Sequence, residues 1–361
     1  MRLVVLPGDG IGPEICAATC EVLHLLNRRM SLDISLENHE IGLAALKRYG
    51  TTFPVAAEEA CRAADGILLG PVSHADYPSR AEGGINVSGE LRISLDLYAN
   101  IRPAKTRESL PHWGRTPMDL VIVRENTEGF YADRNMFWGA GEFMPTRDIA
   151  LAVRKITAEG SRRIAKSAFE LAATRRKKVT AVHKANVMKV SDNLFLREVR
   201  DVARSYPGVT YDEQLVDSMA ALLIRDAGRF DVIVTTNMFG DILSDEAAEL
   251  SGSLGLAGSL NAGEAYGMAQ AQHGSAPDIA GQDKANPVSL VLSAAMLLGW
   301  LSRRHHIDKL ARAAKQMEDA VDTLLRDPTM RTTDLGGSLG TRAFTSALSA
   351  ALTDEMNRHA T

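Results

Sequence analysis

Short apolar segments alternate with longer segments of helical periodicity along most of the 361-residue chain, and this alternation constrains the fold more than any single motif. We expect buried strands over residues 3–6, 34–39, 66–69, 119–124, 179–183, 209–215 and 231–236. We expect helices over residues 13–28, 159–174, 192–205, 287–303, 310–326 and 341–357. Segments 70–90 and 103–118 are rich in Pro, Gly, Ser and charged residues, which is typical of loops. The pattern predicts an α/β protein with largely parallel strands, and the length predicts two lobes.

The composition excludes several classes of partner. Hydrophobic residues make up 45% of the chain and charged residues 24%, as in ordinary soluble globular proteins. The formal net charge of −4 gives no sign of a nucleic-acid or membrane-surface partner, so we expect a small-molecule ligand. The most apolar predicted helix, at residues 288–301, is too short to span a bilayer. Because no signal-peptide pattern follows Met1 and the three cysteines lack zinc-type spacing, we expect a cytoplasmic protein.

Residues 7–13 read PGDGIGP and join the first predicted strand to a helix, where a dinucleotide-binding fingerprint would stand. That fingerprint needs a third glycine three residues after the second, but Pro13 occupies the position. Proline is instead a favourable first residue of a helix. The segment therefore predicts a tight structural turn, and the fold is not expected to be a Rossmann fold.

Residues 237–256 read NMFGDILSDEAAELSGSLGL and follow the predicted strand 231–236, which we expect to end at Gly240. The apolar spacing after Gly240 is helical, so Asp241 and Asp245 lie one turn apart on one face. Two carboxylates so close are most easily explained by a cation between them, and Mg²⁺ or Mn²⁺ prefers such hard oxygen ligands. The alternative is an acidic helix start stabilised by the helix dipole.

Three arginines indicate a pocket for carboxylates. Arg92 lies on a predicted helix, Arg102 follows ten residues later, and Arg124 ends a predicted strand. The guanidinium fork of arginine matches a carboxylate in a bidentate manner, and ligands of α/β proteins bind where strands end. Each arginine alone is equally explained by an ordinary salt bridge, but together they suggest a site for a polycarboxylate.

Three further residues follow predicted strands or their turns. Tyr131 lies seven residues after Arg124, and Lys184 and Asp217 each come directly after a strand pattern. Tyr131 is explained equally well as a packed aromatic side chain with a solvated hydroxyl. Lys184 is either solvated or a proton carrier, and Asp217 either caps a helix or provides a third metal carboxylate.

The motifs together resemble those of the β-decarboxylating dehydrogenases, the family of isopropylmalate, homoisocitrate, isocitrate, and tartrate or D-malate dehydrogenases. The resemblance extends nearly from end to end, through residues 6–12 (LPGDGIG), 96–105 (DLYANIRPAK), 124–129 (RENTEG), 183–187 (HKANV), 237–256 and 273–281 (HGSAPDIAG). It is strongest toward isopropylmalate and homoisocitrate dehydrogenases. The implied fold has two lobes in an α/β/α arrangement around a central mixed sheet.

The resemblance also implies a division of the chain. Residues 1–97 and 255–361 would form a cofactor-binding lobe, and residues 98–254 would form the metal, substrate and dimerisation lobe. Segment 132–157 is more apolar than an isolated loop, and we expect it to be an arm between subunits. The apolar residues of this arm are Met136, Phe137, Trp138, Phe143 and Met144.

By the same resemblance, the chain catalyses NAD-dependent oxidative decarboxylation of a 3-substituted (R)-malate to a 2-oxo acid, as in amino-acid biosynthesis. Arg92, Arg102 and Arg124 would hold the malate carboxylates, and Asp217, Asp241 and Asp245 would bind Mg²⁺ or Mn²⁺. Tyr131 and Lys184 would be the acid–base pair. The family forms homodimers with shared sites, in which Lys184 and Asp217 would come from the partner chain.

The cofactor residues implied by the resemblance lie in the sixth motif, residues 273–281, and just after it. They are His273, Gly274, Ser275, Ala276, Asp278, Ile279 and Asn286. Asp278 favours NAD, because a carboxylate accepts from the adenosine ribose and repels the 2′-phosphate of NADP. Gln270 departs from the family, which usually carries glutamate there.

The substrate is left open at its C3 substituent. Isopropylmalate enzymes usually carry a leucine pair before Arg92, whereas this chain has Asn86 and Ser88, which are reminiscent of the residues that isocitrate enzymes use. Tartrate, D-malate and isocitrate therefore remain alternative substrates. Two other classes also remain, namely a non-catalytic regulatory subunit and a module that binds a phosphorylated ligand through residues 8–12.

Overall fold

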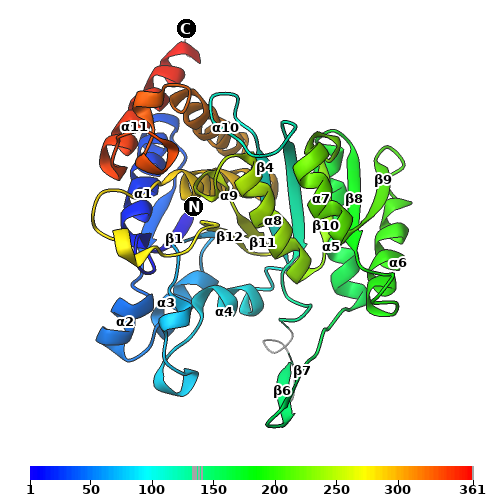
Figure 1. Cartoon of the computed structure of the whole chain (residues 1–361). Coiled ribbons are helices and arrows are strands. Elements are labelled where there is room, and N and C mark those ends of the chain that lie inside the picture. The colour runs from blue at the N-terminus through cyan, green and yellow to red at the C-terminus, as the bar shows by residue number, and fades with distance from the viewer. Residues whose placement is uncertain (132–135, 137–138, 140, 360–361) are drawn as a thin grey trace.

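A single mixed sheet of ten strands organises the computed structural model of the chain (Figure 1). The structure describes residues 1–131, 136, 139 and 141–359, apart from the side chains of residues 355–359. The strand order is β2-β1-β3-β12-β11-β4-β5-β10-β8-β9. The strands are β1 (Arg2–Leu6), β2 (Ser35–Asn38), β3 (Gly66–Leu69), β4 (Ala99–Lys105), β5 (Asp119–Glu125), β8 (Lys178–His183), β9 (Thr210–Leu215), β10 (Val232–Thr235), β11 (Leu260–Ala262) and β12 (Gly267–Gln270).

The directions of the strands change at the middle of the sheet. On one side β2, β1, β3 and β12 run parallel, and on the other side β5, β10, β8 and β9 run parallel. Between them β12, β11, β4 and β5 pair antiparallel. The expectation of largely parallel strands therefore holds only on the two flanks, whereas the mixed sheet is confirmed.

Eleven helices lie among the described residues: α1 (Gly12–Met30), α2 (Gly42–Tyr49), α3 (Val55–Arg62), α4 (Val87–Ser94), α5 (Ala158–Ala173), α6 (Ser191–Ala203), α7 (Val216–Asp226), α8 (Asn237–Ser251), α9 (Val288–His305), α10 (Asp308–Leu324) and α11 (Thr341–His359). In this part of the chain no helix is long and apolar enough to cross a membrane.

Alternate residues of the strands point to opposite faces of the sheet, and both faces are covered by helices. In β1, Leu3 and Val5 pack into the cluster formed with α1, α9, α10 and α11, whereas Val4 and Leu6 pack toward α3 and α4. At the other end of the sheet, α5 and α6 cover one face of β5, β8 and β10, and α7 and α8 cover the opposite face. This three-layer arrangement confirms the predicted α/β/α fold.

Several boundaries differ from the prediction. Strand β10 ends at Thr235, and Gly240 lies inside α8, so the expectation that this glycine ends the strand is wrong. The predicted loop 70–90 already contains the first turn of α4, and residues 103–105 of the other predicted loop belong to β4. Each of these segments carries polar residues or proline, which hide its periodicity in the sequence.

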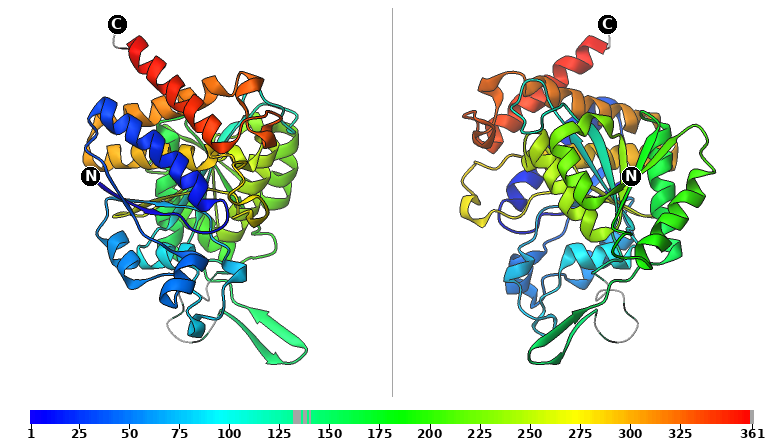
Figure 2. Two further views of the ribbon diagram at one scale, coloured as in Figure 1. Left: turned by 90° about the vertical axis from the view of Figure 1, so that its left-hand side faces the viewer. Right: turned by 45° about the vertical axis from the view of Figure 1, so that its right-hand side comes forward.

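The segment expected to form an arm contains a two-stranded hairpin, β6 (Glu142–Thr146) and β7 (Ile149–Ala152). Figure 2 shows from two further sides that this hairpin extends away from the body of the molecule. Phe143, Met144, Ile149 and Leu151 are all exposed on it. Of the other arm residues, Phe137 and Trp138 lie outside the described residues.

Candidate active site

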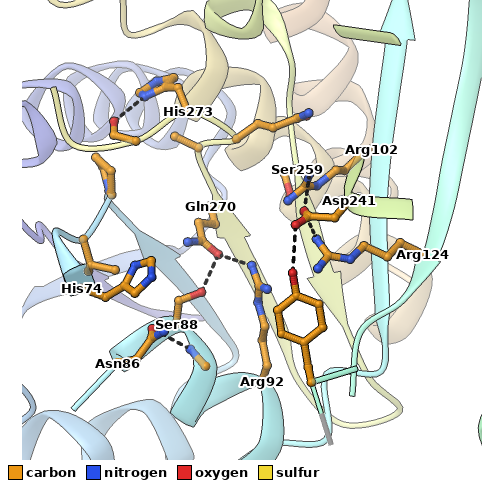
Figure 3. Close-up of a pocket in the computed structure, with 17 residues that line it drawn as sticks. His74, Asn86, Ser88, Arg92, Arg102, Arg124, Asp241, Ser259, Gln270 and His273 are labelled. Atoms are coloured by element: carbon orange, nitrogen blue, oxygen red, sulfur yellow. Dashed lines mark hydrogen bonds and ion pairs between the residues drawn. The ribbon is translucent and has the colours of Figure 1, made fainter. Parts of the chain in front are cut away.

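A pocket of about 280 Å³ opens where the antiparallel centre of the sheet meets α4 and α8 (Figure 3). Its walls come from segments far apart in the sequence: the loop after β3, helix α4, strands β4 and β5, helix α8, and the segment that follows β12. Nine of the predicted site residues line it, namely Asn86, Ser88, Arg92, Arg102, Arg124, Tyr131, Asp241, His273 and Gly274. The structure thus brings together all three predicted arginines and one of the predicted metal ligands.

Asp241 is the centre of the polar contacts in this pocket. Its Oδ1 accepts from Arg102 Nη1 at 3.3 Å and also from Arg124 Nη1, and its Oδ2 accepts from the Tyr131 hydroxyl at 3.2 Å. Burial alone would raise the pKa of the Asp241 carboxyl, but the charges of Arg124 and Arg102, with that of Arg92, hold its pKa below the ordinary value. Asp241 is therefore ionised at neutral pH.

Asp245 lies on the same face of α8 as Asp241, as the sequence predicts. One nitrogen, Arg102 Nη1, reaches both carboxylates, at 3.0 Å from Asp245 Oδ1. The first turn of α8 contains no acidic residue, so the alternative of an acidic helix start does not describe this pair. Two adjacent carboxylates are oxygen ligands of the kind that Mg²⁺ or Mn²⁺ prefers, and here Arg102 Nη1 contacts both of them.

Arg124 is held in place on β5 by buried polar contacts. Its Nε and Nη2 both donate to Asn237 Oδ1, at 2.9 and 2.6 Å, and Asn237 Nδ2 donates to the Glu128 carbonyl at 3.0 Å. Burial, together with the nearby charge of Arg102, lowers the pKa of the Arg124 guanidinium to about 10. Arg124 therefore remains a cation at neutral pH, directed at Asp241.

Gly240 allows α8 to approach β5 closely. A Cβ at this position would lie 2.7 Å from both Cβ and Cγ of Arg124 and 3.2 Å from Thr235 Cγ2. We expect Gly240→Ala to lower the free energy of unfolding by about 1–3 kcal/mol, because the buried helix or Arg124 must shift. We also expect it to impair any activity that depends on Arg124.

The measurement is chemical denaturation of the variant beside Gly208→Ala, since a Cβ at Gly208 meets no atom within 4 Å. Equal stability of the two variants would show that the close contact between α8 and β5 is not needed.

Lys184 and Asp217 lie outside the pocket. Lys184 Nζ donates to Asp217 Oδ1 at 2.6 Å, and this hydrogen bond holds the pKa of the Asp217 carboxyl below its ordinary value. The backbone N–H of Lys184 donates to Asp192, a fully buried carboxylate that also pairs with Arg154. Among the described residues, no three His, Cys, Asp or Glu side chains form a group that could hold a metal. Within one chain, Asp217 therefore does not join Asp241 and Asp245.

The predicted cofactor residues form a loop beside the pocket. His273 Nδ1 contacts the Gly274 carbonyl at 3.0 Å, burial lowers the pKa of its imidazole, and its buried Nε2 has no partner among the described residues. Asp278 and Ile279 lie in a short 3-10 turn, with Asp278 exposed and Ile279 packed on the core. Asn286 is buried, donates to Asp334 at 2.9 Å and accepts from the Val288 backbone. A buried imidazole nitrogen without a partner fits a ligand that donates or accepts a hydrogen bond there.

The turn at residues 7–13 supports this loop. The Ile11 backbone donates to the Ser275 carbonyl at 2.8 Å, and Ser73 and Ser275 share a hydrogen bond between their hydroxyls at 2.7 Å. Gly10 has φ +56°, and a Cβ there would lie 1.9 Å from the Ser275 carbonyl oxygen. The glycine is thus required by close packing, in agreement with the interpretation of the segment as a structural turn.

The residues in or beside the pocket that were not predicted include Asn237, Gln272 and His74. Asn237, which orients Arg124, opens the motif at residues 237–256 but carries no signal that separates it from a helix start. Gln272 donates to Asp245 Oδ1 at 2.8 Å, and His74 lines the pocket from the loop after β3. No periodicity or spacing in the sequence marks His74, which begins a three-residue 3-10 turn, or Gln272, which lies in an irregular segment.

Comparisons with known proteins give one consistent family. The family described as isocitrate/isopropylmalate dehydrogenase matches residues 2–352. A 3-isopropylmalate dehydrogenase of Saccharolobus solfataricus is 42% identical over 339 residues, which cover 93% of this chain and 95% of the relative. An isocitrate/homoisocitrate dehydrogenase of Thermus thermophilus is also 42% identical, over 355 residues that cover 97% of this chain and 98% of the relative. The crystal structure of an isocitrate dehydrogenase from Methylococcus capsulatus matches with a TM-score of 0.84 and 36% identity, covering 97% of this chain and 99% of that one.

Proposed function

Because the chain belongs to the isocitrate/isopropylmalate dehydrogenase family, we propose that it oxidatively decarboxylates a 3-substituted (R)-malate to a 2-oxo acid, with NAD and with Mg²⁺ or Mn²⁺. One observation carries the proposal: Arg92, Arg102 and Arg124 line a single pocket with Asp241. Three guanidinium groups around one carboxylate suit a substrate with several carboxylates and a divalent cation.

The arginines bind and orient the substrate. Arg102 and Arg124 already contact Asp241, so a substrate carboxylate placed against them also lies close to Asp241. Arg92 approaches from α4, on the side of Gln270. Fixing the carboxylates in this way holds C2 and C3 in one orientation, which lowers the entropic part of the barrier.

Asp241 and Asp245 would hold the cation, and the loop from His273 to Asn286 would hold the nucleotide. When bound, the cation draws electron density from the C2 oxygen and the nicotinamide accepts the hydride. His273 offers its buried Nε2, and Asp278, exposed in the same segment, suits the ribose hydroxyls of NAD and disfavours a 2′-phosphate.

Lys184 and Tyr131 would move the protons. As hydride leaves C2, Lys184, in the form of the neutral amine, takes the proton of the C2 hydroxyl, so that C2 becomes a ketone. The bond from C3 to its carboxylate then breaks, CO₂ leaves, and the electron pair is delocalised toward the C2 oxygen. Tyr131 gives a proton to C3 and so completes the 2-oxo acid. Its hydroxyl, at 3.2 Å from Asp241 Oδ2, lies in the pocket where this step would occur.

Two copies of the chain would complete each site, with Lys184 and Asp217 of one copy beside Asp241 of the other. Exposed apolar side chains lie near both parts of the proposed shared site. Ile242 follows Asp241 and is 61% exposed, and Val187 and Val190 near Lys184 are 66% and 87% exposed. Apolar exposure of this kind is typical of a surface that pairs. Residues 98–254 would form this pairing lobe, and residues 1–97 with 255–361 the cofactor lobe.

The proposal is tested by an absorbance assay of NADH formation, together with detection of CO₂. The purified chain is given NAD with isopropylmalate, homoisocitrate, isocitrate, D-malate or tartrate, each with Mn²⁺ and after chelation. We expect equal amounts of NADH and CO₂ from at least one substrate, and loss of both on chelation. No turnover of any substrate would favour a regulatory subunit and contradict the proposal.

The depressed pKa of Asp241 has a consequence for metal binding at low pH. A carboxyl with a lowered pKa keeps its charge above that pKa and loses it only as the pH falls through it. We therefore expect the affinity for Mn²⁺, measured by calorimetry, to change little between about pH 7 and pH 5. A steep, proton-linked loss of affinity over this interval would show that Asp241 is protonated there.

A further inference from the structure

Arg154 is buried although it lies only two residues after the exposed hairpin of β6 and β7. Its side chain is 9% exposed. Its Nη1 donates to Asp192 Oδ1 at 2.5 Å and to Ser191 Oγ at 2.9 Å, and its Nη2 donates to Thr236 Oγ1 at 3.0 Å. The guanidinium carbon also lies 5.4 Å from the centre of the Phe239 ring on α8. One guanidinium at the base of the hairpin thus joins the start of α6 to the start of α8.

The second oxygen of Asp192 holds the backbone of Lys184. Asp192 is fully buried in the first turn of α6, and its Oδ2 accepts from the Lys184 N–H at 2.5 Å. The Lys184 carbonyl accepts from the backbone N–H groups of Val187 and Met188, at 3.0 and 2.9 Å. Because both backbone polar groups of Lys184 are bonded, the point from which its long side chain extends is fixed.

Stability alone does not account for the ion pair of Arg154 and Asp192. Taking two charges out of water costs free energy, and apolar side chains of similar volume often stabilise a core equally well or better. What the ion pair provides, and an apolar pair does not, is a carboxylate with two accepting oxygens. Arg154 holds one oxygen, which leaves the other directed at the Lys184 N–H. The pair is therefore best explained by the backbone that it orients.

We propose that Asp192 and Arg154 are positioning residues, which fix Lys184 at the place from which it reaches the site of the second copy of the chain. The inference rests on the proposed function, in which Lys184 is the proton acceptor. A proton acceptor works only within hydrogen-bond reach of the proton that it takes. A displacement of about 1 Å can lower a rate by roughly 10²-fold. Since neither residue lines the pocket, the loss belongs in kcat and not in KM.

Asp192→Asn separates the two bonds, because an amide can turn its single oxygen toward Arg154 or toward the Lys184 N–H but not toward both. With saturating NAD and Mn²⁺, we expect kcat to fall by about 10²-fold, while KM for the substrate and KM for NAD stay within about twofold. Asp201→Asn makes the same chemical change at an exposed ion pair of α6 and is the matched control. A kcat equal to that of the control would overturn the proposal.

A double variant separates positioning from stability. Arg154→Met with Asp192→Leu replaces the ion pair by apolar side chains of similar size, a replacement that is often neutral or stabilising for buried ion pairs. It also leaves the Lys184 N–H without its acceptor. We expect this variant to melt at or above the wild-type temperature and still to lose about 10²-fold in kcat. Wild-type kcat in the double variant would show that the pair is only structural and would overturn the proposal.

Mixed dimers show which site Asp192 serves. Asp192→Asn subunits are unfolded and refolded together with Asp241→Asn subunits or with Lys184→Met subunits. With Asp241→Asn, each mixed dimer has one site in which an intact Asp241 meets a correctly placed Lys184, so we expect about a quarter of the wild-type activity. With Lys184→Met no such site forms, and we expect no recovery.

The pattern of recovery decides the outcome. Recovery with Lys184→Met subunits would place the effect of Asp192 in the site of its own chain and overturn the proposal. Recovery with neither partner would overturn it as well, when Asp241→Asn and Lys184→Met subunits complement each other. If that reference pair also fails to complement, or if the wild-type chain turns over no substrate, the proposed function itself is overturned, and this inference with it.

Discussion

Asp241→Asn is expected to lower kcat/KM by about 10³-fold or more. We expect no other substitution among the pocket residues of the same chain to have a larger effect. The wild-type carboxylate faces Arg102, Arg124 and Tyr131, so the amide would remove both the proposed metal ligand and the charge that balances two arginines. The same variant should bind Mn²⁺ at least tenfold more weakly in a calorimetric titration.

The control is Asp201→Asn, because Asp201 forms an exposed ion pair with Arg204 on α6, away from the pocket. Wild-type Mn²⁺ affinity and turnover in Asp241→Asn would refute the assignment of this carboxylate to the metal site. A loss of turnover with unchanged Mn²⁺ affinity would restrict its role to orienting the arginines.

Lys184→Met is expected to lower kcat by roughly 10²–10⁴-fold, the usual contribution of a positioned proton acceptor. This prediction is the more demanding because Lys184 does not line the pocket of its own chain and pairs there with Asp217. Methionine keeps the length and apolar character of the side chain while it removes the charge. We expect KM for the substrate to change less than kcat.

Lys166→Met is the matched control, since Lys166 forms an exposed i,i+4 ion pair with Glu170 on α5. If Lys184→Met retains the kcat of this control at every pH, the lysine is not the proton acceptor and its bond to Asp217 is only structural.

The sequence predicts best the elements that are buried on both faces. The side chains of β1 and β3 point alternately to two layers of helices, so every residue after the first of β1 is buried and apolar. This continuous apolar run can be recognised in the sequence without knowledge of the fold. The central strands β4, β11 and β12 were not predicted. Asn100, Asn261 and Gln270 interrupt their apolar pattern, because these side chains satisfy one another only after the strands have paired.

In the candidate site, too, the features that depend on local spacing were predicted and those that depend on distant residues were not. The spacing of Asp241 and Asp245 predicts their common face, because a helix converts sequence distance directly into position. Gly240 was assigned to a strand end because its actual constraint, the close approach of Arg124, comes from a residue more than a hundred positions away. The orientation of Gln270 likewise depends on its hydrogen bond with Asn261, which the sequence around Gln270 does not indicate.

The most direct test of the account is complementation between two inactive variants. Asp241→Asn and Lys184→Met subunits are unfolded together and refolded, so that mixed dimers form at random. Each mixed dimer would hold one site with both an intact Asp241 and an intact Lys184 from the other copy. We expect recovery of about a quarter of the wild-type activity, since half of the dimers are mixed and half of their sites are intact. Activity no greater than that of the separate variants would contradict a site shared between two copies of the chain.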